Sequence, residues 1–188
     1  MKADLDIQVS QTEFRDASSF DIEAIAALHA DSWRRHFRGA YSDEFLDGDV
    51  FADRLAVWTD RLVRPELPAN QCTILAECDA VLVGFAHTLL DEDPRWGALL
   101  DNLHVRHDSK GCGIGTRLMA ETASAVIDRT PGSGLYLWVL EQNEAAQAFY
   151  EVRGGTCAGR EVSQPPGGSS VVGLRYVWPD PSVLIERK

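Results

Sequence analysis

Three glycines at alternate positions form the feature of this sequence best suited to chemistry. They lie in the segment Lys110-Gly111-Cys112-Gly113-Ile114-Gly115-Thr116. Because glycine has no Cβ atom, a ligand can approach the backbone closely there. A helix that begins at such a turn has N–H groups without intrahelical partners and a partial positive charge from its dipole. With Lys110 beside it, the turn predicts a site for a phosphate group.

Several other uses of this turn can be weighed from the sequence. Glycine marks connecting turns in general, so the spacing alone also fits a plain connector. Neither G-x-G-x-x-G nor G-K-[ST] is present, which argues against a dinucleotide or nucleoside triphosphate loop. Cys112 at a helix N-terminus suggests a nucleophile, but a phosphate in the turn would exclude an acyl substrate, so we expect its side chain to pack. The histidines and cysteines have no metal-ligand spacing, and no metal is expected.

The turn must be positioned by the elements on either side of it. An apolar strand is predicted from Leu99 to Val105, and residues at helical spacing follow Ile114 up to a proline-glycine stop. Leu135 to Leu140 is typical of another strand. Asn143 is a favoured N-cap and opens a second helix that ends at Gly154.

The remaining sequence predicts helices first and strands afterwards. An amphipathic helix is expected after Asp21, and one or two more between Tyr41 and Leu62. Strands are expected at Glu13–Arg15, Cys72–Cys78, Val81–Leu90, Thr156–Val162 and Val171–Trp178. Hairpin connections make neighbours antiparallel, whereas a strand-helix-strand passage permits a parallel pair. Residues 1–188 therefore predict a single α/β domain, with a mixed sheet covered by helices on both faces.

Composition limits the classes of partner. Of the 188 residues, 45% are hydrophobic and 25% are charged, as in ordinary soluble globular proteins. The net charge of −11 repels phosphate backbones and argues against nucleic-acid binding. The longest apolar run, Ala80 to Ala86, is far below the ~20 residues that span a bilayer, and four cysteines do not make a disulfide scaffold. We expect a cytoplasmic protein with no membrane partner.

Two ordered motifs resemble the GCN5-related N-acetyltransferases. The family has an apolar-x-Val triplet followed by Arg/Gln-x-x-Gly-x-Gly/Ala, which is matched by Leu103-His104-Val105 and by Lys110 to Gly115. Its Asn-x-x-Ala-x-x-Phe-Tyr-Glu-x-x-Gly element is matched by Asn143 to Gly154. Lys110 replaces the usual Arg or Gln. Gly155 replaces a usual Phe, which predicts thinner packing behind the second helix.

The resemblance implies a three-layer fold and a cofactor site. The expected fold has a mixed, mostly antiparallel central sheet that is flanked by helices and splayed open between Leu99–Val105 and Leu135–Leu140. Acetyl-CoA would place its pyrophosphate on the glycine turn and its pantetheine arm along the first of these strands. The implied cofactor contacts are Leu103, His104, Val105, Lys110, Gly111, Cys112, Gly113, Ile114, Gly115, Thr116, Asn143 and Tyr150.

The implied reaction is direct attack of an amine on the acetyl thioester. The family's tyrosine at Tyr150 points at the sulfur, and a phenol can donate the proton that the departing thiolate needs. Without the motif, Tyr150 would be a core tyrosine. Many relatives carry a glutamate base at the position of Trp138, so that role cannot be transferred. Asp101, directly or through water, and His104 are the candidate bases, and strand alternation places them on opposite faces.

The acceptor is expected to be an amine on a small molecule or peptide. Carboxylates after the first helix (Asp43, Glu44, Asp47, Asp49, Asp53) and at the hairpin end (Asp91, Glu92, Asp93) suggest a cationic acceptor, although an ordinary solvated face explains them equally. Trp33, Phe37 and Tyr41 are the candidate substrate contacts. A non-catalytic acyl-CoA binding or sensing module is the alternative function. The resemblance also allows a homodimer.

Overall fold

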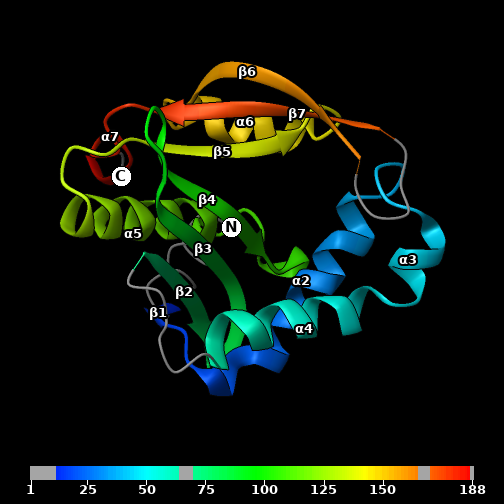
Figure 1. Cartoon of the computed structure of the whole chain (residues 1–188). Coiled ribbons are helices and arrows are strands. Elements are labelled where there is room, and N and C mark those ends of the chain that lie inside the picture. The colour runs from blue at the N-terminus through cyan, green and yellow to red at the C-terminus, as the bar shows by residue number, and fades with distance from the viewer. Residues whose placement is uncertain (1–11, 64–69, 165–169, 187–188) are drawn as a thin grey trace.

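A seven-stranded sheet organises the molecule. The computed structural model describes residues 12–63, 70–164 and 170–186 (Figure 1). The strands lie in the order β1-β2-β3-β4-β5-β7-β6. Their bounds are β1 Thr12–Asp16, β2 Gln71–Cys78, β3 Val81–Asp93, β4 Gly97–Val105, β5 Leu135–Leu140, β6 Thr156–Ser163 and β7 Val171–Trp178. Only β4 and β5 are parallel, and the other neighbouring pairs are antiparallel. The predicted mixed, mostly antiparallel sheet is confirmed.

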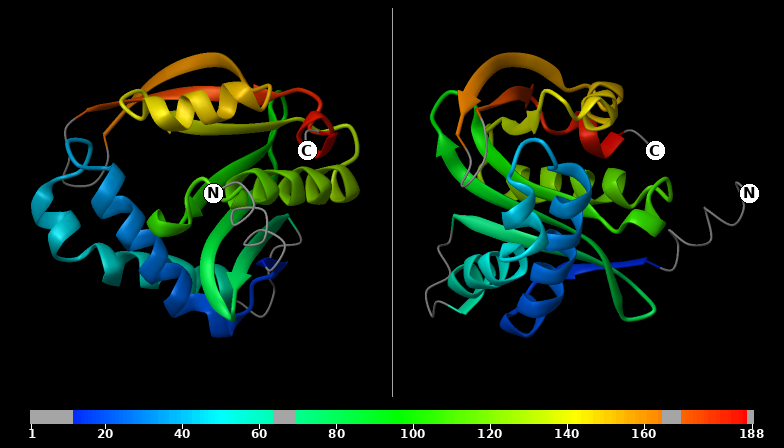
Figure 2. Two further views of the ribbon diagram at one scale, coloured as in Figure 1. Left: turned by 180° about the vertical axis from the view of Figure 1, so that it is seen from behind. Right: turned by 90° about the vertical axis from the view of Figure 1, so that its right-hand side faces the viewer.

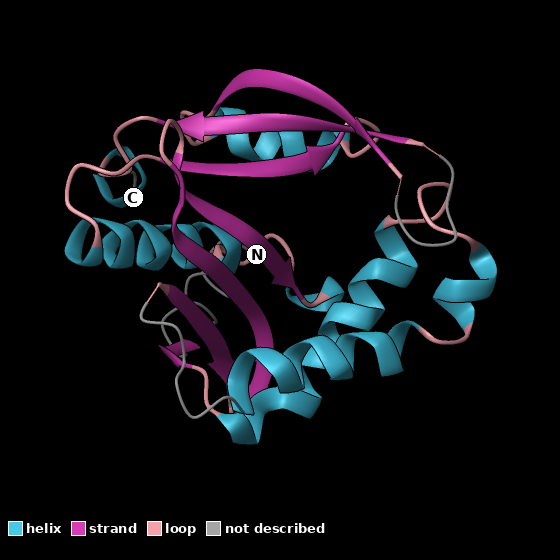
Figure 3. Cartoon of the chain, viewed as in Figure 1, coloured by secondary structure: helices cyan, strands magenta, loops and turns pink. Residues whose placement is uncertain are grey.

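The helices fall into two groups along the chain. The first group is η1 Ser19–Asp21, α2 Ile22–His36, α3 Asp43–Asp47 and α4 Val50–Val63, and the second is η2 His107–Ser109, α5 Ile114–Arg129, α6 Glu144–Val152 and α7 Val183–Glu186. Helices α2, α3 and α4 gather on one side of the molecule, apart from α5 and α7 (Figure 3). Within the described ranges, no helix combines the length and the apolarity needed to cross a membrane.

Side-chain alternation lets helices cover both faces of the N-terminal strands. On one face, Leu75 of β2 and Phe85 of β3 pack against Trp58 of α4 and the buried side of α2. On the other face, Ile74 of β2 packs against Leu118 of α5. Figure 2 shows α5 and α6 from behind, where they lie over the strands. The sheet is therefore the middle one of three layers.

The sheet opens between β4 and β5. These strands pair only at Ala98 with Leu135 and at Leu99 with Tyr136, next to the start of both strands. Beyond those pairs the two strands diverge, as Figure 1 shows. The backbone of residues 100–105 therefore has β3 on one side and no strand partner on the other. The predicted splay is confirmed.

Packing behind α6 differs from the expectation. Gly155 was expected to thin this region because it lacks the ring of the family's phenylalanine. The indole of Trp178 fills the space, since a Cβ atom at Gly155 would lie 2.6 Å from Trp178 Cζ2. Trp178 is 1% exposed, and its Nε1 donates a hydrogen bond to the carbonyl oxygen of Arg153. A tryptophan from β7 thus replaces the missing ring.

Candidate active site

A cavity of about 910 Å³ lies where β4 and β5 diverge. Its walls come from residues 100–105 of β4, residues 137–140 of β5, the glycine turn, α6 and inward-facing residues of α2 and α4. Residues 103–105, 110, 111, 113–116, 143 and 150, all expected cofactor contacts, border this cavity. The splay of the sheet therefore creates a space that reaches from the glycine turn to Tyr150.

The glycine turn has the backbone geometry that its sequence predicts. Gly111 and Gly113 have φ of +81° and +80°, a region that side-chain-bearing residues rarely adopt. Gly113 is the N-cap of α5. Because glycine has no side chain to cap the helix, the first backbone amides of α5 remain available to a ligand. At Gly115 a Cβ atom would lie 3.2 Å from Phe149 Cζ, so glycine lets α6 approach closely. Cys112 packs in the core, as expected for its side chain, and it is the one implied cofactor contact that does not border the cavity.

Lys110 is held by a residue that the sequence analysis did not single out. Its Nζ donates a hydrogen bond to Nε2 of His36 at the end of α2, over 2.7 Å. Burial and the nearby Lys110 ammonium lower the pKa of His36, which favours the neutral, accepting imidazole. Burial also lowers the pKa of Lys110. Helix α2 therefore fixes the lysine beside the turn.

Tyr150 is a core residue that also borders the cavity. Its ring lies 5.4 Å from Phe149 and 6.0 Å from both Tyr176 and Trp178, measured between ring centroids. Burial raises the pKa of Tyr150 to about 12, so the phenol is protonated near neutral pH. No other described residue hydrogen-bonds its hydroxyl. Asn143 caps α6 as predicted, because its Oδ1 accepts from the Ala146 amide over 3.2 Å.

The two candidate bases have different surroundings. His104 Nδ1 lies 2.8 Å from Ser32 Oγ, and its ring lies 4.6 Å from that of His29. Burial lowers the pKa of His104 to about 3. Asp101 accepts a 2.7 Å hydrogen bond from Arg61 Nη2. Both residues border the cavity, and His104 is a neutral imidazole near neutral pH.

Strict alternation along β4 is wrong at Asp101. The register against β3 shifts where His87 pairs with Asn102 and Thr88 pairs with Leu100, which leaves Asp101 as the extra residue of a β-bulge. As a result Asn102 Nδ2 donates to Asp101 Oδ2 over 2.5 Å, although alternation placed these side chains on opposite faces. The bulge turns the carboxylate toward α4, where Arg61 meets it.

The expected substrate contacts divide into two groups. Trp33 of α2 and Phe37, its C-cap residue, border the cavity, whereas Tyr41 does not. Tyr41 instead packs within an aromatic cluster that joins α2, α3 and α4, with its ring 4.7 Å from Trp33 and 5.9 Å from Phe45. Its assignment to the substrate therefore loses its structural basis.

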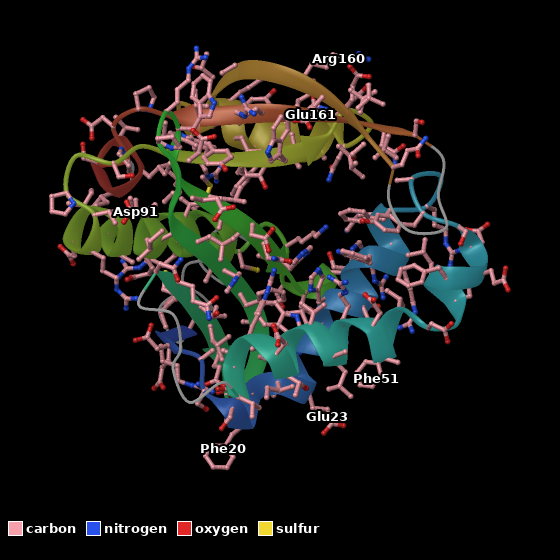
Figure 4. All side chains as sticks on the ribbon, viewed as in Figure 1. Phe20, Glu23, Phe51, Asp91, Arg160 and Glu161 are labelled. Carbon is pink, nitrogen blue, oxygen red and sulfur yellow. The ribbon has the colours of Figure 1, made fainter. Side chains whose placement is uncertain are left out.

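The acidic rim is also placed elsewhere than expected. None of the carboxylates that suggested a cationic acceptor borders the cavity. Asp43 and Asp47 pair with Arg38, and Asp53 pairs with Arg54. Asp91 lies on the opposite side of the molecule from α3 (Figure 4). The reason for expecting a cationic acceptor is thereby removed.

Three arginines at the cavity, Arg54, Arg61 and Arg153, escaped the sequence analysis. Arg54 lies 4.1 Å above the Trp33 ring, and Arg61 lies 5.1 Å from the Trp58 ring. Arg175 lies over Trp138, which itself borders the cavity from β5. The spacing of Arg54, Trp58 and Arg61 along one helix face is the signal that would have found the two arginines. Arg153 at the end of α6 carried no such signal.

Glu161 borders the cavity from β6, above the opening in Figure 4. Within the described ranges, no group of three or more histidine, cysteine and acidic side chains is arranged to hold a metal ion. The arrangement therefore combines an anion-binding turn, a protonated phenol and a space between two strands. Such a site can hold an elongated, phosphate-bearing ligand and protonate a leaving group beside Tyr150.

Comparison with known proteins gives a consistent result. Residues 25–154 match the model of the Acetyltransferase (GNAT) family. The chain is 25% identical over 169 residues to a protein of Mycobacterium tuberculosis described as a probable N-acetyltransferase, covering 89% of this chain and 93% of that one.

Solved structures share the fold. The PaiA N-acetyltransferase of Thermoplasma acidophilum, solved in complex with coenzyme A, matches with a TM-score of 0.67 and 20% identity, over 89% of this chain and 99% of that one. A Salmonella typhimurium protein solved with its cofactor acetyl-CoA matches with a TM-score of 0.61 and 19% identity, over 89% and 92% of the two chains.

Proposed function

Because the chain belongs to the Acetyltransferase (GNAT) family, we propose that residues 1–188 act as one N-acetyltransferase domain, which transfers the acetyl group of acetyl-CoA to an amine. The observation that carries this proposal is the continuous cavity from the glycine turn to Tyr150. The acceptor is a primary amine on a small molecule or peptide, and Trp33 and Phe37 offer it an apolar wall.

The residues present fit the cofactor. The amides at the start of α5 and the Lys110 ammonium suit a pyrophosphate. The unpaired edge of β4 at residues 100–105 offers backbone N–H and C=O groups to the amides of a pantetheine arm, which would bind like an added strand. When bound, acetyl-CoA supplies the activated thioester. Two of the solved structures that share this fold hold coenzyme A or acetyl-CoA, which supports the same cofactor for this chain.

Tyr150 acts as the general acid in this proposal. The residue borders the cavity, and its hydroxyl has no hydrogen-bond partner among the described residues and keeps its proton because burial raises its pKa to about 12. It can therefore donate a hydrogen bond to sulfur while negative charge develops, and pass on the proton when a desolvated thiolate becomes the stronger base.

Neither candidate base is a strong one. His104 has its pKa lowered to about 3, so its neutral imidazole accepts a proton only weakly at neutral pH. Asp101 is engaged by Arg61 and Asn102. We propose that a water relay beside Asp101 or His104 accepts the amine proton, and that the amine's own ionisation governs the rate of attack.

The decisive experiment measures thiol release from acetyl-CoA with a pool of primary amines, alongside cofactor binding by calorimetry. Release that depends on an amine supports the enzyme. Tight binding without release under any amine would support the alternative, a non-catalytic acyl-CoA binding or sensing module. The variant Gly113→Val is the control, since a branched side chain at φ of +80° blocks the turn and should abolish binding.

A further inference from the structure

Arg153 is a partly buried cation at the cavity wall that no motif assigns. It follows α6 as its C-cap residue, and its guanidinium lies across the start of α5. Its Nε donates to Thr116 Oγ1 over 3.1 Å, Nη2 donates to the same oxygen, and Nη1 donates to the Phe149 carbonyl over 2.8 Å. The guanidinium carbon lies 3.5 Å from the Phe149 ring centroid. The side chain is therefore fixed before any ligand arrives.

The hydrogen bonds of Arg153 leave donors free. A guanidinium has five N–H groups, and the contacts above use one on each nitrogen. One N–H on Nη1 and one on Nη2 remain without an acceptor among the described residues. No carboxylate among them pairs with Arg153, in contrast to Arg117, the residue after Thr116 in α5, which pairs with Glu121 over 2.7 Å. In a chain of net charge −11, an unpaired cation facing a cavity requires an explanation.

Thr116 extends the same argument. Its hydroxyl accepts from Arg153, which leaves its own proton to be donated elsewhere. Thr116 also belongs to the first turn of α5, whose backbone amides face the cavity end with the helix dipole behind them. A guanidinium fork, a hydroxyl and a helix N-terminus thus converge on the cavity beside the glycine turn.

We propose that Arg153, with Thr116, binds a phosphate of coenzyme A at the adenosine end of the cavity and adds a second cation to the one that Lys110 supplies. A planar guanidinium presents two parallel N–H groups, which is the geometry that phosphate oxygens accept best. The proposal rests on coenzyme A being the cofactor and does not depend on the acceptor. The phosphate is either part of the pyrophosphate or the 3′-phosphate of the ribose.

The test compares binding of coenzyme A and of 3′-dephospho-coenzyme A by titration calorimetry. Arg153→Met keeps an unbranched side chain over Phe149 and removes the charge. Coenzyme A affinity should fall about 10- to 100-fold, because charge-assisted hydrogen bonds are lost. If dephospho-coenzyme A is then unaffected, the partner is the 3′-phosphate. If both ligands lose affinity equally, it is the pyrophosphate. Arg117→Gln removes a cation from α5, next to Thr116, without touching the cavity and should leave both affinities unchanged.

The salt dependence of coenzyme A binding shows whether Arg153 contacts the phosphate itself or only stabilises the glycine turn. Coenzyme A affinity of the wild type should weaken more steeply than that of Arg153→Met between about 0.05 and 0.5 M salt, because one screened charge contact is missing in the variant. Arg153→Lys should recover part of the affinity. Equal salt dependence, or less than about a twofold loss in Arg153→Met, would overturn the proposal. Failure of the wild type to bind coenzyme A would instead refute the proposed function.

Discussion

At the scale of single residues, Tyr150 joins two environments, an aromatic core and the cavity. We expect Tyr150→Phe to lower kcat by about 10²–10⁴ with little change in cofactor affinity, because the ring stays and only the proton donor is lost. Steady-state kinetics and calorimetric titration measure the two effects separately. Tyr176→Phe is the matched control. It removes a neighbouring hydroxyl that donates to Glu151 and does not border the cavity, so kcat should persist. Near wild-type turnover in Tyr150→Phe would remove it from the mechanism.

The lowered pKa of His104 has a kinetic consequence. An unperturbed histidine base would give a pH profile with an inflection near its usual pKa of about 6.5. Burial lowers the pKa of His104 to about 3, so this group does not titrate in the neutral range. We expect kcat/KM for a primary amine to rise about tenfold per pH unit from about pH 6 to about pH 9, following the free amine. A plateau above about pH 7 would show that a matched base takes the proton.

Some site residues can be predicted from the sequence and others cannot. The motifs identified the glycine turn, Asn143 and Tyr150, because those residues are close in sequence to the elements that hold them. His36 and Lys110 meet across 74 positions, and Arg153 and Thr116 across 37, so only the folded chain brings each pair together. The rim carboxylates failed as a guide for a different reason, because none of them borders the cavity although Asp43, Asp47 and Asp53 have arginine partners close in sequence. Arg38, just after α2, pairs with Asp43 and Asp47, and Arg54 of α4 pairs with Asp53, so these carboxylates are engaged at the surface and do not line the cavity.

At the scale of elements, the β2–β3 hairpin carries backbone strain. Its turn residues Asp79 and Ala80 have φ of +51° and +60°. In this left-handed region the Cβ atom of alanine lies too close to the following carbonyl oxygen, which destabilises the turn. We expect Ala80→Gly to raise the free energy of unfolding by about 0.5–1 kcal/mol, as measured by urea denaturation. Ala56→Gly, at an exposed position of α4, is the same substitution inside a helix and should lower stability by a similar amount. If both variants changed the free energy of unfolding in the same direction, the interpretation of a strained turn would be contradicted.

Most element bounds were predictable because apolar periodicity and glycine or proline stops are local signals. The parallel pair and the splay followed from the order of strands and helices together with the family resemblance. The bulge at Asp101 was not predictable, since alternation assumes that every residue of β4 has a partner on β3. The indole of Trp178 behind Gly155 was hidden as well, because it comes from a strand 23 residues further on.

At the scale of the whole molecule, buried histidines couple stability to pH. His29, His87 and His104 pack around the α2–α4–β3 core, where burial lowers all three pKa values, that of His87 to about 4 and that of His104 to about 3. Below about pH 6.5 the unfolded chain binds protons that the folded chain does not, so stability falls as the pH decreases. Each histidine contributes at most about 1.4 kcal/mol per pH unit.

We therefore expect the free energy of unfolding, measured by urea denaturation without cofactor, to drop between about pH 6.5 and about pH 5. His87→Gln should flatten this dependence by removing one of the three groups, even if the variant is less stable at neutral pH. An unfolding free energy that is constant over the same interval would contradict the assignment. Carboxylates such as Asp21, whose pKa Arg15 lowers to about 2, act only at lower pH.

Strands β4 and β5 are joined by only two residue pairs. The proposed cofactor site is the gap between the two strands that begins where this pairing ends. A ligand that hydrogen-bonds to the unpaired backbone of both strands would also strengthen the sheet where its strands are least well paired. Amides of residues 100–105 and 137–140 should then exchange with deuterated solvent quickly in the empty protein and slowly in the loaded one. The concentration of acetyl-CoA around the protein would in this way set how fast proteases degrade it, so that cofactor supply would govern the lifetime of the protein as well as its rate.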